Sequence, residues 1–177
     1  DQGASVVKVE APGIGDIGRW VGVTRGGLSA MVQMVNRGKR SIAVNLREAE
    51  GQSIVRGLAR QADVFVQNFR PGVIDRLGLS CETLRAENPE VVYVSISGFG
   101  SEGPYRDKSA YDPVVQAYSG LAALQSDLET NEPQLLYHTA ADKITALTAS
   151  QAITAALFAR GRGAGGQHLE ISMLEAV

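Results

Sequence analysis

Asp142 is the side chain of this sequence with the clearest potential for chemistry. It lies in residues 137–151, where small and apolar residues predict the start of a helix. A carboxylate in this position either complements the positive end of the helix dipole or acts as a reactive group. We favour the second interpretation, in which Asp142 is a nucleophile. His138 precedes it by four residues and is a candidate neighbour, although a histidine without a chemical role is the commoner case.

An asparagine, an aromatic residue and two arginines follow a predicted strand at residues 62–67. They are Asn68, Phe69, Arg70 and Arg76, with a Pro-Gly turn between them. A phenyl ring can lie on a flat heterocycle, and guanidinium groups bind phosphates bidentately. An ordinary strand-to-helix loop with solvated arginines has the same composition, so both interpretations stay open on the residues alone.

Two further segments have the composition of ligand-binding loops. Residues 36–41 are strongly basic, which suits a phosphate or an exposed turn, and Arg47 follows the next predicted strand. Residues 98–109 are rich in glycine, which lets a ligand approach the backbone closely. This loop contains Lys108, and Tyr111 comes directly after it. A glycine-rich loop by itself is a weak indicator of function.

Short β-branched segments alternate with segments of helical periodicity along the chain. We expect strands at residues 4–10, 41–46, 62–67, 91–96 and 167–172, and helices at residues 28–35, 48–61, 80–88, 111–124, 140–160 and from Met173 onward. This order predicts an α/β fold with a mostly parallel open sheet flanked by helices. In such a sheet, ligands bind at the carboxyl ends of the strands. His168 falls at an exposed position of the last strand and is assigned no role.

Composition and charge exclude several classes of protein. The net charge of -2 over 177 residues argues against a general nucleic-acid binder. We find no apolar run that could span a bilayer, and no cluster of His, Cys or carboxylate residues that indicates a metal site. The single cysteine, Cys81, permits no internal disulfide and fits a reducing compartment, so we expect a cytoplasmic protein.

Five segments occur together in one order. They are Asn-Arg-Gly-Lys-Arg-Ser-Ile at 36–42, Asn-Phe-Arg-Pro-Gly-Val-Ile-Asp-Arg-Leu-Gly at 68–78, Gly-Phe-Gly-Ser-Glu-Gly-Pro-Tyr at 98–105, Ala-Asp-Lys at 141–143, and Gly-Gly-Gln-His-Leu-Glu-Ile-Ser-Met-Leu-Glu-Ala at 165–176. In this combination the sequence resembles the family III coenzyme A transferases, the CaiB/BaiF family, over essentially the whole chain.

The resemblance implies a Rossmann-like large domain that binds coenzyme A, a homodimer of two interlocked rings, and transfer of CoA from an acyl-CoA to a carboxylic acid. Asp142 matches the catalytic aspartate of the family, which passes through a mixed anhydride and an aspartyl-CoA thioester. The residues that match CoA-binding positions are Arg47, Asn68, Phe69, Arg70, Arg76, Lys108 and Tyr111.

Two alternatives stay open beside the transferase. The family's α-methylacyl-CoA racemases abstract a proton next to the thioester with a histidine and an aspartate. Their histidine lies in a Gly-His-Asp stretch, which reads Ala110–Tyr111–Asp112 in this sequence, and tyrosine is a poor base near neutral pH. The other alternative is a non-catalytic CoA-binding fragment. Because the chain begins at Asp1 and ends within an apolar pattern, we expect part of a longer protein, namely the N-terminal part of the large domain without the small domain.

Overall fold

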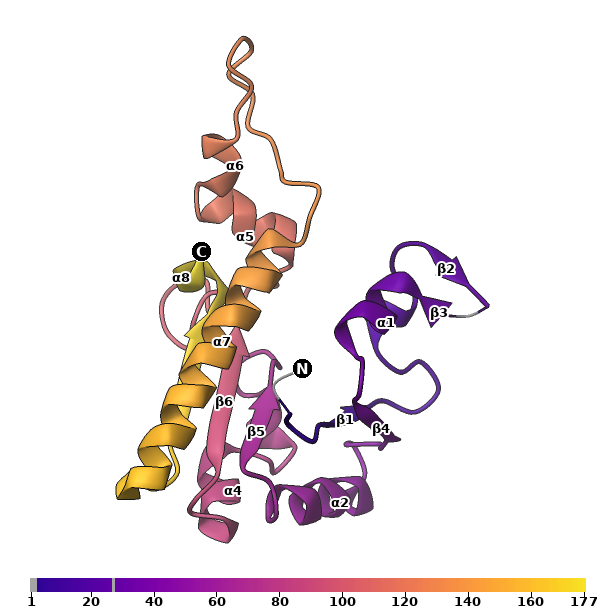
Figure 1. Ribbon diagram of the computed structural model, residues 1–177, viewed down its shortest axis with the longest axis vertical. Coiled ribbons are helices and arrows are strands. Elements are labelled where there is room, and N and C mark those ends of the chain that lie inside the picture. Colours follow the sequence, from indigo (N-terminus) through magenta and orange to yellow (C-terminus); the bar gives the residue numbers. More distant parts are fainter. Residues whose placement is uncertain (1–2, 27) are drawn as a thin grey trace. The chain divides into compact units, whose positions relative to one another are not determined.

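The computed structural model describes residues 3–26 and 28–177 (Figure 1). It forms two compact units, Asp1–Gly57 and Leu58–Val177, and the boundary falls within helix α2. The first unit carries one of the predicted site residues, Arg47. The second unit carries all the others.

The first unit contains two parallel strands joined by a short helical segment. Strand β1 pairs with β4, so that Val9 lies opposite Ile42. A small antiparallel pair, β2 with β3, lies between them in the sequence. The elements are β1 (Val7–Glu10), η1 (Ile17–Arg19), β2 (Thr24–Arg25), β3 (Leu28–Ser29), α1 (Ala30–Val35), β4 (Arg40–Ala43) and α2 (Ala49–Ala59).

A buried carboxylate organises the loop after β1. Both oxygens of Glu10 accept from the Arg19 guanidinium, at 2.8 Å from Nε and 2.9 Å from Nη2. The Asp16 backbone N–H and the Ser41 hydroxyl donate to the same carboxylate. These contacts, led by Arg19, lower the pKa of Glu10 to about 2. Gly15 has a φ of +68°, and a Cβ there would come within 2.8 Å of both partners, so the loop requires glycine at this position.

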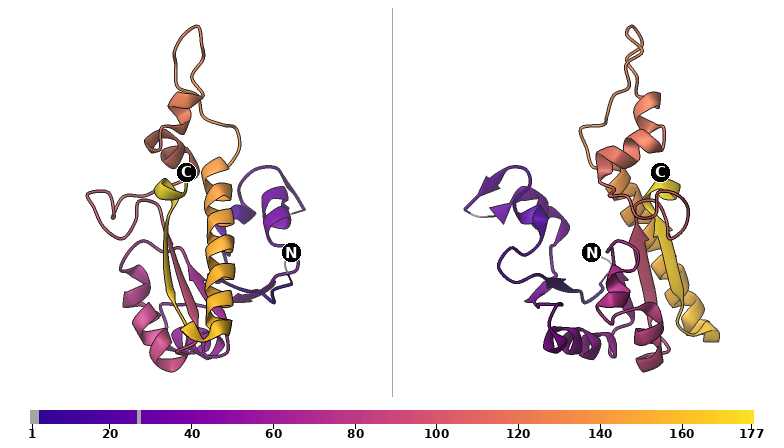
Figure 2. Two further views of the ribbon diagram at one scale, coloured as in Figure 1. Left: turned by 60° about the vertical axis from the view of Figure 1, so that its left-hand side comes forward. Right: turned by 180° about the vertical axis from the view of Figure 1, so that it is seen from behind.

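The second unit is built on a parallel sheet in the order β5-β6-β7. Its strands are β5 (Val64–Gln67), β6 (Val92–Ser97) and β7 (His168–Ser172). Alternate residues of β6 point to opposite faces. On one face, Val92 and Val94 form a buried core with Ile171 of β7 and with Ala149 and Ala156 of α7 (Ala140–Ala159). Both views in Figure 2 show α7 lying along the sheet.

The direction of α7 places its first turn at the carboxyl ends of the strands. At its other end, Arg160 donates to the backbone oxygens of Asp63 and Glu90, which precede β5 and β6. The segment η2 (Arg160–Ala164) then leads to β7. Asp142, in the first turn of α7, therefore lies near the edge of the sheet where α/β folds bind ligands.

The expected strands and the parallel sheet are confirmed, and two expected helices are corrected. The helix expected at 111–124 is two helices, α5 (Asp112–Tyr118) and α6 (Leu121–Leu124), because Gly120 takes a φ of +84° between them. The helix expected at 28–35 begins only at Ala30, since the two residues before it pair with β2.

The remaining helices of the second unit are short. They are α3 (Val73–Arg76), α4 (Cys81–Glu87) and α8 (Met173–Ala176). Ser80 caps α4 as the sequence predicts, because its hydroxyl accepts from the Thr83 backbone N–H at 3.1 Å. After α6, the polar segment 125–139 extends away from the sheet before α7 begins (Figures 1 and 2). Among the described residues, no helix combines the length and apolar character needed to cross a bilayer.

Candidate active site

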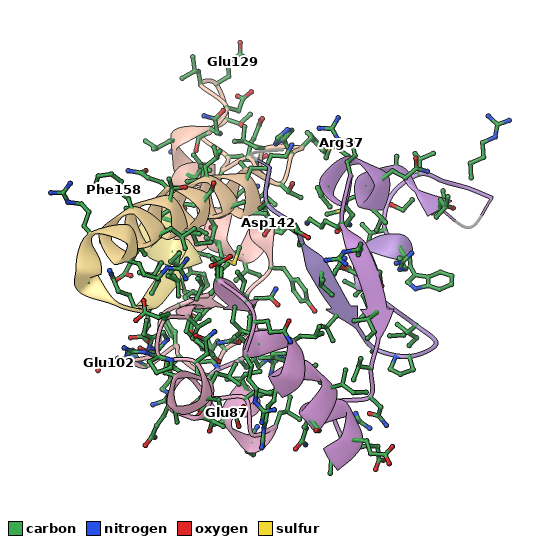
Figure 3. All side chains as sticks on the ribbon, turned by 60° about the horizontal axis from the view of Figure 1, so that its bottom comes forward. Arg37, Glu87, Glu102, Glu129, Asp142 and Phe158 are labelled. Atoms are coloured by element: carbon green, nitrogen blue, oxygen red, sulfur yellow. The ribbon has the colours of Figure 1, made fainter. Side chains whose placement is uncertain are left out.

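Asp142 occupies the third position of α7, where backbone N–H groups have no partner within the helix. The N-cap residue, Thr139, makes no side-chain hydrogen bond to the helix. Instead, the Asp142 backbone N–H donates to Oδ2 of Asp112, at 2.9 Å. Asp112 begins α5, so a carboxylate from a different helix caps the turn that carries the predicted nucleophile. Figure 3 labels Asp142 near the start of α7 and Phe158 toward its other end.

A second donor holds the other oxygen of the Asp112 carboxylate. Nε2 of Gln116, one turn further along α5, donates to Oδ1 of Asp112. Oε1 of Gln116 accepts from the Leu136 backbone N–H at 2.9 Å. Both side chains are buried. Gln116 thus binds the backbone at Leu136, before His138, and Asp112 binds the backbone at Asp142, after it. Together they hold the segment that leads into α7 against α5.

Surrounding protein and a neighbouring charge both raise the pKa of the Asp142 carboxyl group. Burial is the larger cause that raises its pKa, and the Asp112 charge raises it further. The residue nevertheless keeps an exposed surface, so a reactant can reach it. A carboxylate with a raised pKa is a better nucleophile when ionised and takes up a proton at higher pH than an ordinary aspartate.

The predicted neighbour His138 has a different partner. Its Nε2 lies 2.6 Å from Nζ of Lys143, and both residues are exposed. A lysine ammonium is a donor only, so this contact uses Nε2 of the imidazole as an acceptor. The contact therefore connects the His138 imidazole to Lys143 and not to the Asp142 carboxylate.

A cavity of about 520 Å³ opens on the face of the sheet opposite α7. Phe69 and Arg70 line it, as do Tyr93, Ser95 and His168 from the strands. Nη2 of Arg70 also donates to the Ser109 hydroxyl, which connects the loop after β5 to the glycine-rich loop after β6. Two of the predicted CoA-binding residues thus share one cavity, and two predicted ligand-binding loops touch one another.

The other predicted site residues lie outside the lining of this cavity. Asn68 and Arg76 are exposed beside it, and a Cβ at Gly72 would come within 3.5 Å of Nη1 of Arg76. Tyr111 is 68% exposed and directly precedes α5. Arg47 is exposed in the first unit, where its backbone N–H donates to the Asn45 side chain.

Aromatic residues give the glycine-rich loop a local core. The rings of Phe99, Tyr105 and Tyr118 pack against one another with centroids 5.3–5.6 Å apart. Nζ of Lys108 lies 4.1 Å from the centre of the Tyr105 ring, which is a cation–π distance. The predicted CoA contact Lys108 is therefore held on the loop by an aromatic side chain.

The described part of the chain contains no group of three or more His, Cys, Asp or Glu side chains arranged for a metal ion.

Comparison with known proteins identifies the family. The family model described as CoA-transferase family III matches residues 1–177. The chain belongs to CoA-transferase family III.

Curated relatives are about 40% identical to this chain over the residues that align with it. An acyl-CoA transferase of Fusarium pseudograminearum is 40% identical over 185 residues, covering 99% of this chain and 40% of its own length. An acetyl-CoA:oxalate CoA-transferase of Acetobacter aceti is 40% identical over 176 residues, and the match covers 99% of this chain and 45% of the relative. A human succinyl-CoA:glutarate CoA-transferase is 37% identical, and the match covers 99% of this chain and 40% of the relative. The chain thus spans less than half the length of these relatives.

Solved structures agree with the family III assignment and with the fold. A CaiB/BaiF family protein of Brucella suis superposes with a TM-score of 0.93 at 39% identity, covering 99% of this chain and 47% of its own. A hypothetical protein of Mycobacterium tuberculosis superposes with a TM-score of 0.89 at 32% identity, and the match covers 98% of this chain and 48% of that protein. The α/β fold with parallel strands and flanking helices is therefore that of the CaiB/BaiF proteins.

Two features of the candidate site escaped prediction from sequence. Asp112 is predicted only as a counterpart of the racemase motif, and the usable signal in the sequence is its spacing of four residues, one helix turn, from Gln116. His168 was assigned no role because it is exposed, but its Nε2 lies 2.9 Å from the Ser95 hydroxyl on the cavity floor. This contact depends on the pairing of β6 with β7, which no local pattern reports.

Proposed function

We propose that this chain carries the nucleophile and part of the CoA-binding surface of a CoA-transferase, with Asp142 as the nucleophile. The observation that carries this proposal is the capping of Asp142 by Asp112, which fixes the backbone of a carboxylate whose pKa is raised by burial and, to a smaller extent, by the Asp112 charge. The carboxylate lies near the same edge of the sheet as the loop that presents Phe69 and Arg70. Membership of family III supports CoA transfer as the reaction class.

The proposed reaction proceeds in four steps. An oxygen of Asp142 attacks the thioester carbonyl of the donor, and the C–S bond breaks to release CoA thiolate and leave a mixed anhydride. The thiolate attacks the Asp142 carbonyl, so the donor acid leaves and an aspartyl-CoA thioester remains. The acceptor carboxylate displaces CoA thiolate from this thioester and forms a second anhydride. The thiolate then attacks the acceptor carbonyl, which gives the new acyl-CoA and regenerates the Asp142 carboxylate.

In this mechanism a bound CoA would extend across the edge of the sheet formed by the carboxyl ends of the strands, from the cavity on one face to Asp142 on the other. The cavity with Phe69 and Arg70 lies on one face, whereas α7, with Asp142 in its first turn, packs on the other. We infer that the nucleotide contacts Phe69, Arg70, Arg76 and Asn68, and that the pantetheine arm passes Lys108 and Tyr111. Arg47 is proposed to contact a phosphate. A guanidinium and an aromatic ring suit phosphate and adenine respectively.

The anhydride steps require protection from water, because hydrolysis would end the cycle without transfer. Asp142 keeps an exposed surface in this chain. We therefore propose that protein beyond these residues covers Asp142, from the same longer polypeptide, from a second copy in a homodimer, or from both. The cytoplasm supplies both acyl-CoA and carboxylic acids and is the proposed location.

The test is covalent trapping. The longest soluble form of the protein is incubated with succinyl-CoA, and its intact mass is measured with and without hydroxylamine. We expect an adduct that maps to Asp142, disappears with hydroxylamine and is absent from Asp142→Ala. With no adduct, exchange of the α-proton of a 2-methylacyl-CoA in heavy water would replace the proposal by racemisation. CoA binding without either signal would replace it by a binding role.

A further inference from the structure

A directed chain of hydrogen bonds runs across the floor of the cavity to the loop that carries Phe69. The Phe69 backbone N–H lies 2.9 Å from Oε1 of Gln67, and Nε2 of Gln67 lies 3.0 Å from the Ser95 hydroxyl. The same hydroxyl lies 2.9 Å from Nε2 of His168. These hydrogen bonds therefore join three strands, through the last residue of β5, an interior residue of β6 and the first residue of β7, to the start of the loop after β5.

The chemistry of the groups fixes the direction of the first two bonds. A backbone N–H only donates, so Phe69 must face the oxygen of the Gln67 amide, and the amide nitrogen then faces Ser95. Because the Ser95 hydroxyl accepts from Gln67, its own hydrogen is available for Nε2 of His168. In the imidazole tautomer that carries its proton on Nδ1, Nε2 of His168 accepts from Ser95 and completes the series of hydrogen bonds.

Sheet geometry explains why these side chains meet. Gln67 and Ser95 are directly opposite each other in the parallel pairing of β5 with β6, and His168 lies opposite Tyr93 on the next strand. All three polar residues occupy the face that α7 leaves uncovered. The buried Tyr93 ring packs edge-on against the His168 imidazole, with the two ring centroids 5.2 Å apart.

We propose that Gln67, Ser95 and His168 are positioning residues that hold the Phe69 backbone in its CoA-binding conformation. This inference rests on the proposed function, in which Phe69 contacts CoA. Phe69 is 40% exposed, so packing covers only part of its ring. The loop is instead held at two points, by Gln67 at its start and by the bond from Arg70 to Ser109. A loop held before the ligand arrives loses less conformational entropy on binding.

The first test measures binding of CoA itself by titration calorimetry. Ser95→Ala removes the middle of the chain, and we expect the dissociation constant of CoA to rise about three- to tenfold, the effect of one net hydrogen bond. His168→Leu should weaken binding similarly. His168→Gln should restore it to within about twofold, because the Gln amide oxygen can accept from Ser95 near the position of the imidazole Nε2. Thr154→Ala, an exposed hydroxyl on α7, is the control and should change nothing.

The second test separates positioning from general destabilisation. We expect the Phe69 amide proton to exchange faster with solvent in Ser95→Ala, measured by NMR, while the melting temperature falls by no more than about 4 °C, the effect of about one hydrogen bond in a chain of this size. No CoA binding by the wild-type protein would contradict the proposed function itself. Normal binding by the wild type and equal binding by Ser95→Ala would contradict only the positioning role, as would equal losses in His168→Gln and His168→Leu.

Discussion

The backbone N–H of Asp142 donates to the buried carboxylate of Asp112 at 2.9 Å, so one acidic residue holds another at the start of α7. The arrangement has two consequences. The hydrogen bond fixes the backbone from which the Asp142 side chain extends. The charge of Asp112 adds to the effect of burial and raises the pKa of Asp142. Position and basicity of the proposed nucleophile thus depend on the same residue.

Asp112→Asn should impair the proposed activity even though it is nearly isosteric. Both carboxylate oxygens accept from N–H groups, one on Asp142 and one on Gln116, and an amide must turn its NH2 toward one of these donors. We expect kcat to fall about ten- to a hundredfold, the scale of a small misplacement of a reacting group. The acidic limb of the pH–rate profile should move to lower pH, because a negative charge that raises the pKa of Asp142 has been removed.

The double variant Asp112→Asn with Gln116→Glu provides the matched control. The new glutamate can accept from the amide NH2 introduced at position 112 and from the Leu136 N–H, while the oxygen of that amide still faces Asp142. We expect partial recovery of kcat. The recovery is incomplete because Nε2 of Gln116 also lies 3.3 Å from the His138 backbone oxygen, which a carboxylate would repel. A double variant no better than Asp112→Asn would show that the hydrogen-bond pattern is not what matters.

Asp142→Asn should stabilise the fold at neutral pH. The pKa of Asp142 is raised in the folded state, so the folded protein binds more protons than the unfolded chain and loses stability as pH rises from about 3.8 through the raised value. Asparagine has no such loss. We expect a higher melting temperature than wild type at pH 7 and equal melting temperatures near pH 3. A lower melting temperature at pH 7 would mean that attraction between Asp142 and the helix dipole outweighs burial.

Glu10→Gln should destabilise the first unit above pH 4.5. The pKa of Glu10 is lowered from 4.5 to about 2, chiefly by Arg19, so its stabilisation is fully present above pH 4.5 and disappears as pH falls toward 2. The loss should be about 2–3 kcal/mol at pH 7, measured by urea unfolding. Glu87→Gln breaks the more exposed pair with Arg60 and should lose less than about 1 kcal/mol. Equal losses would contradict the special role of Glu10.

Arg70→Lys should weaken CoA binding more than a conservative change normally does. The planar guanidinium of Arg70 can contact Ser109 and a phosphate together, whereas a lysine ammonium lacks this fork of donors. We expect the dissociation constant of CoA to rise about tenfold. Arg60→Lys, which alters an exposed arginine outside the cavity lining, is the control. An unchanged dissociation constant in Arg70→Lys would place the phosphates elsewhere.

The parts of the fold that local patterns encode were predicted from the sequence. β-branched runs marked the strands of the parallel sheet, and the alanine-rich segment marked α7 with Asp142 in its first turn. The break at Gly120 was missed because Tyr118, two residues before it, and Leu121, directly after it, continue an apolar pattern, and only the backbone angle shows the interruption. Leu28 was assigned to a helix for its apolar neighbours, but pairing with Arg25 made it part of a strand.

The sequence predicted individual residues of the candidate site, but not the hydrogen bonds that join them. Phe69 and Arg70 share a cavity, as expected for residues at one strand end. The bond from Asp142 to Asp112 spans 30 residues, and the contact of Ser95 with His168 spans 73. Such contacts depend on how helices and strands pack, which single-residue patterns do not contain.

Transfer of oxygen into Asp142 tests the central claim most directly. In the proposed reaction, the oxygen that bridges the second anhydride comes from the acceptor carboxylate and stays on Asp142 when CoA leaves with the acceptor acyl group. The protein is therefore turned over with an 18O-labelled carboxylic acid and an acyl-CoA donor, then digested with trypsin, and the peptide of residues 109–143 is sequenced by mass spectrometry. We predict a gain of about 2 Da per transferred oxygen, located at Asp142 and absent from the other acidic residues of the peptide. Formation of the new acyl-CoA with no label in Asp142 would contradict its role as the nucleophile.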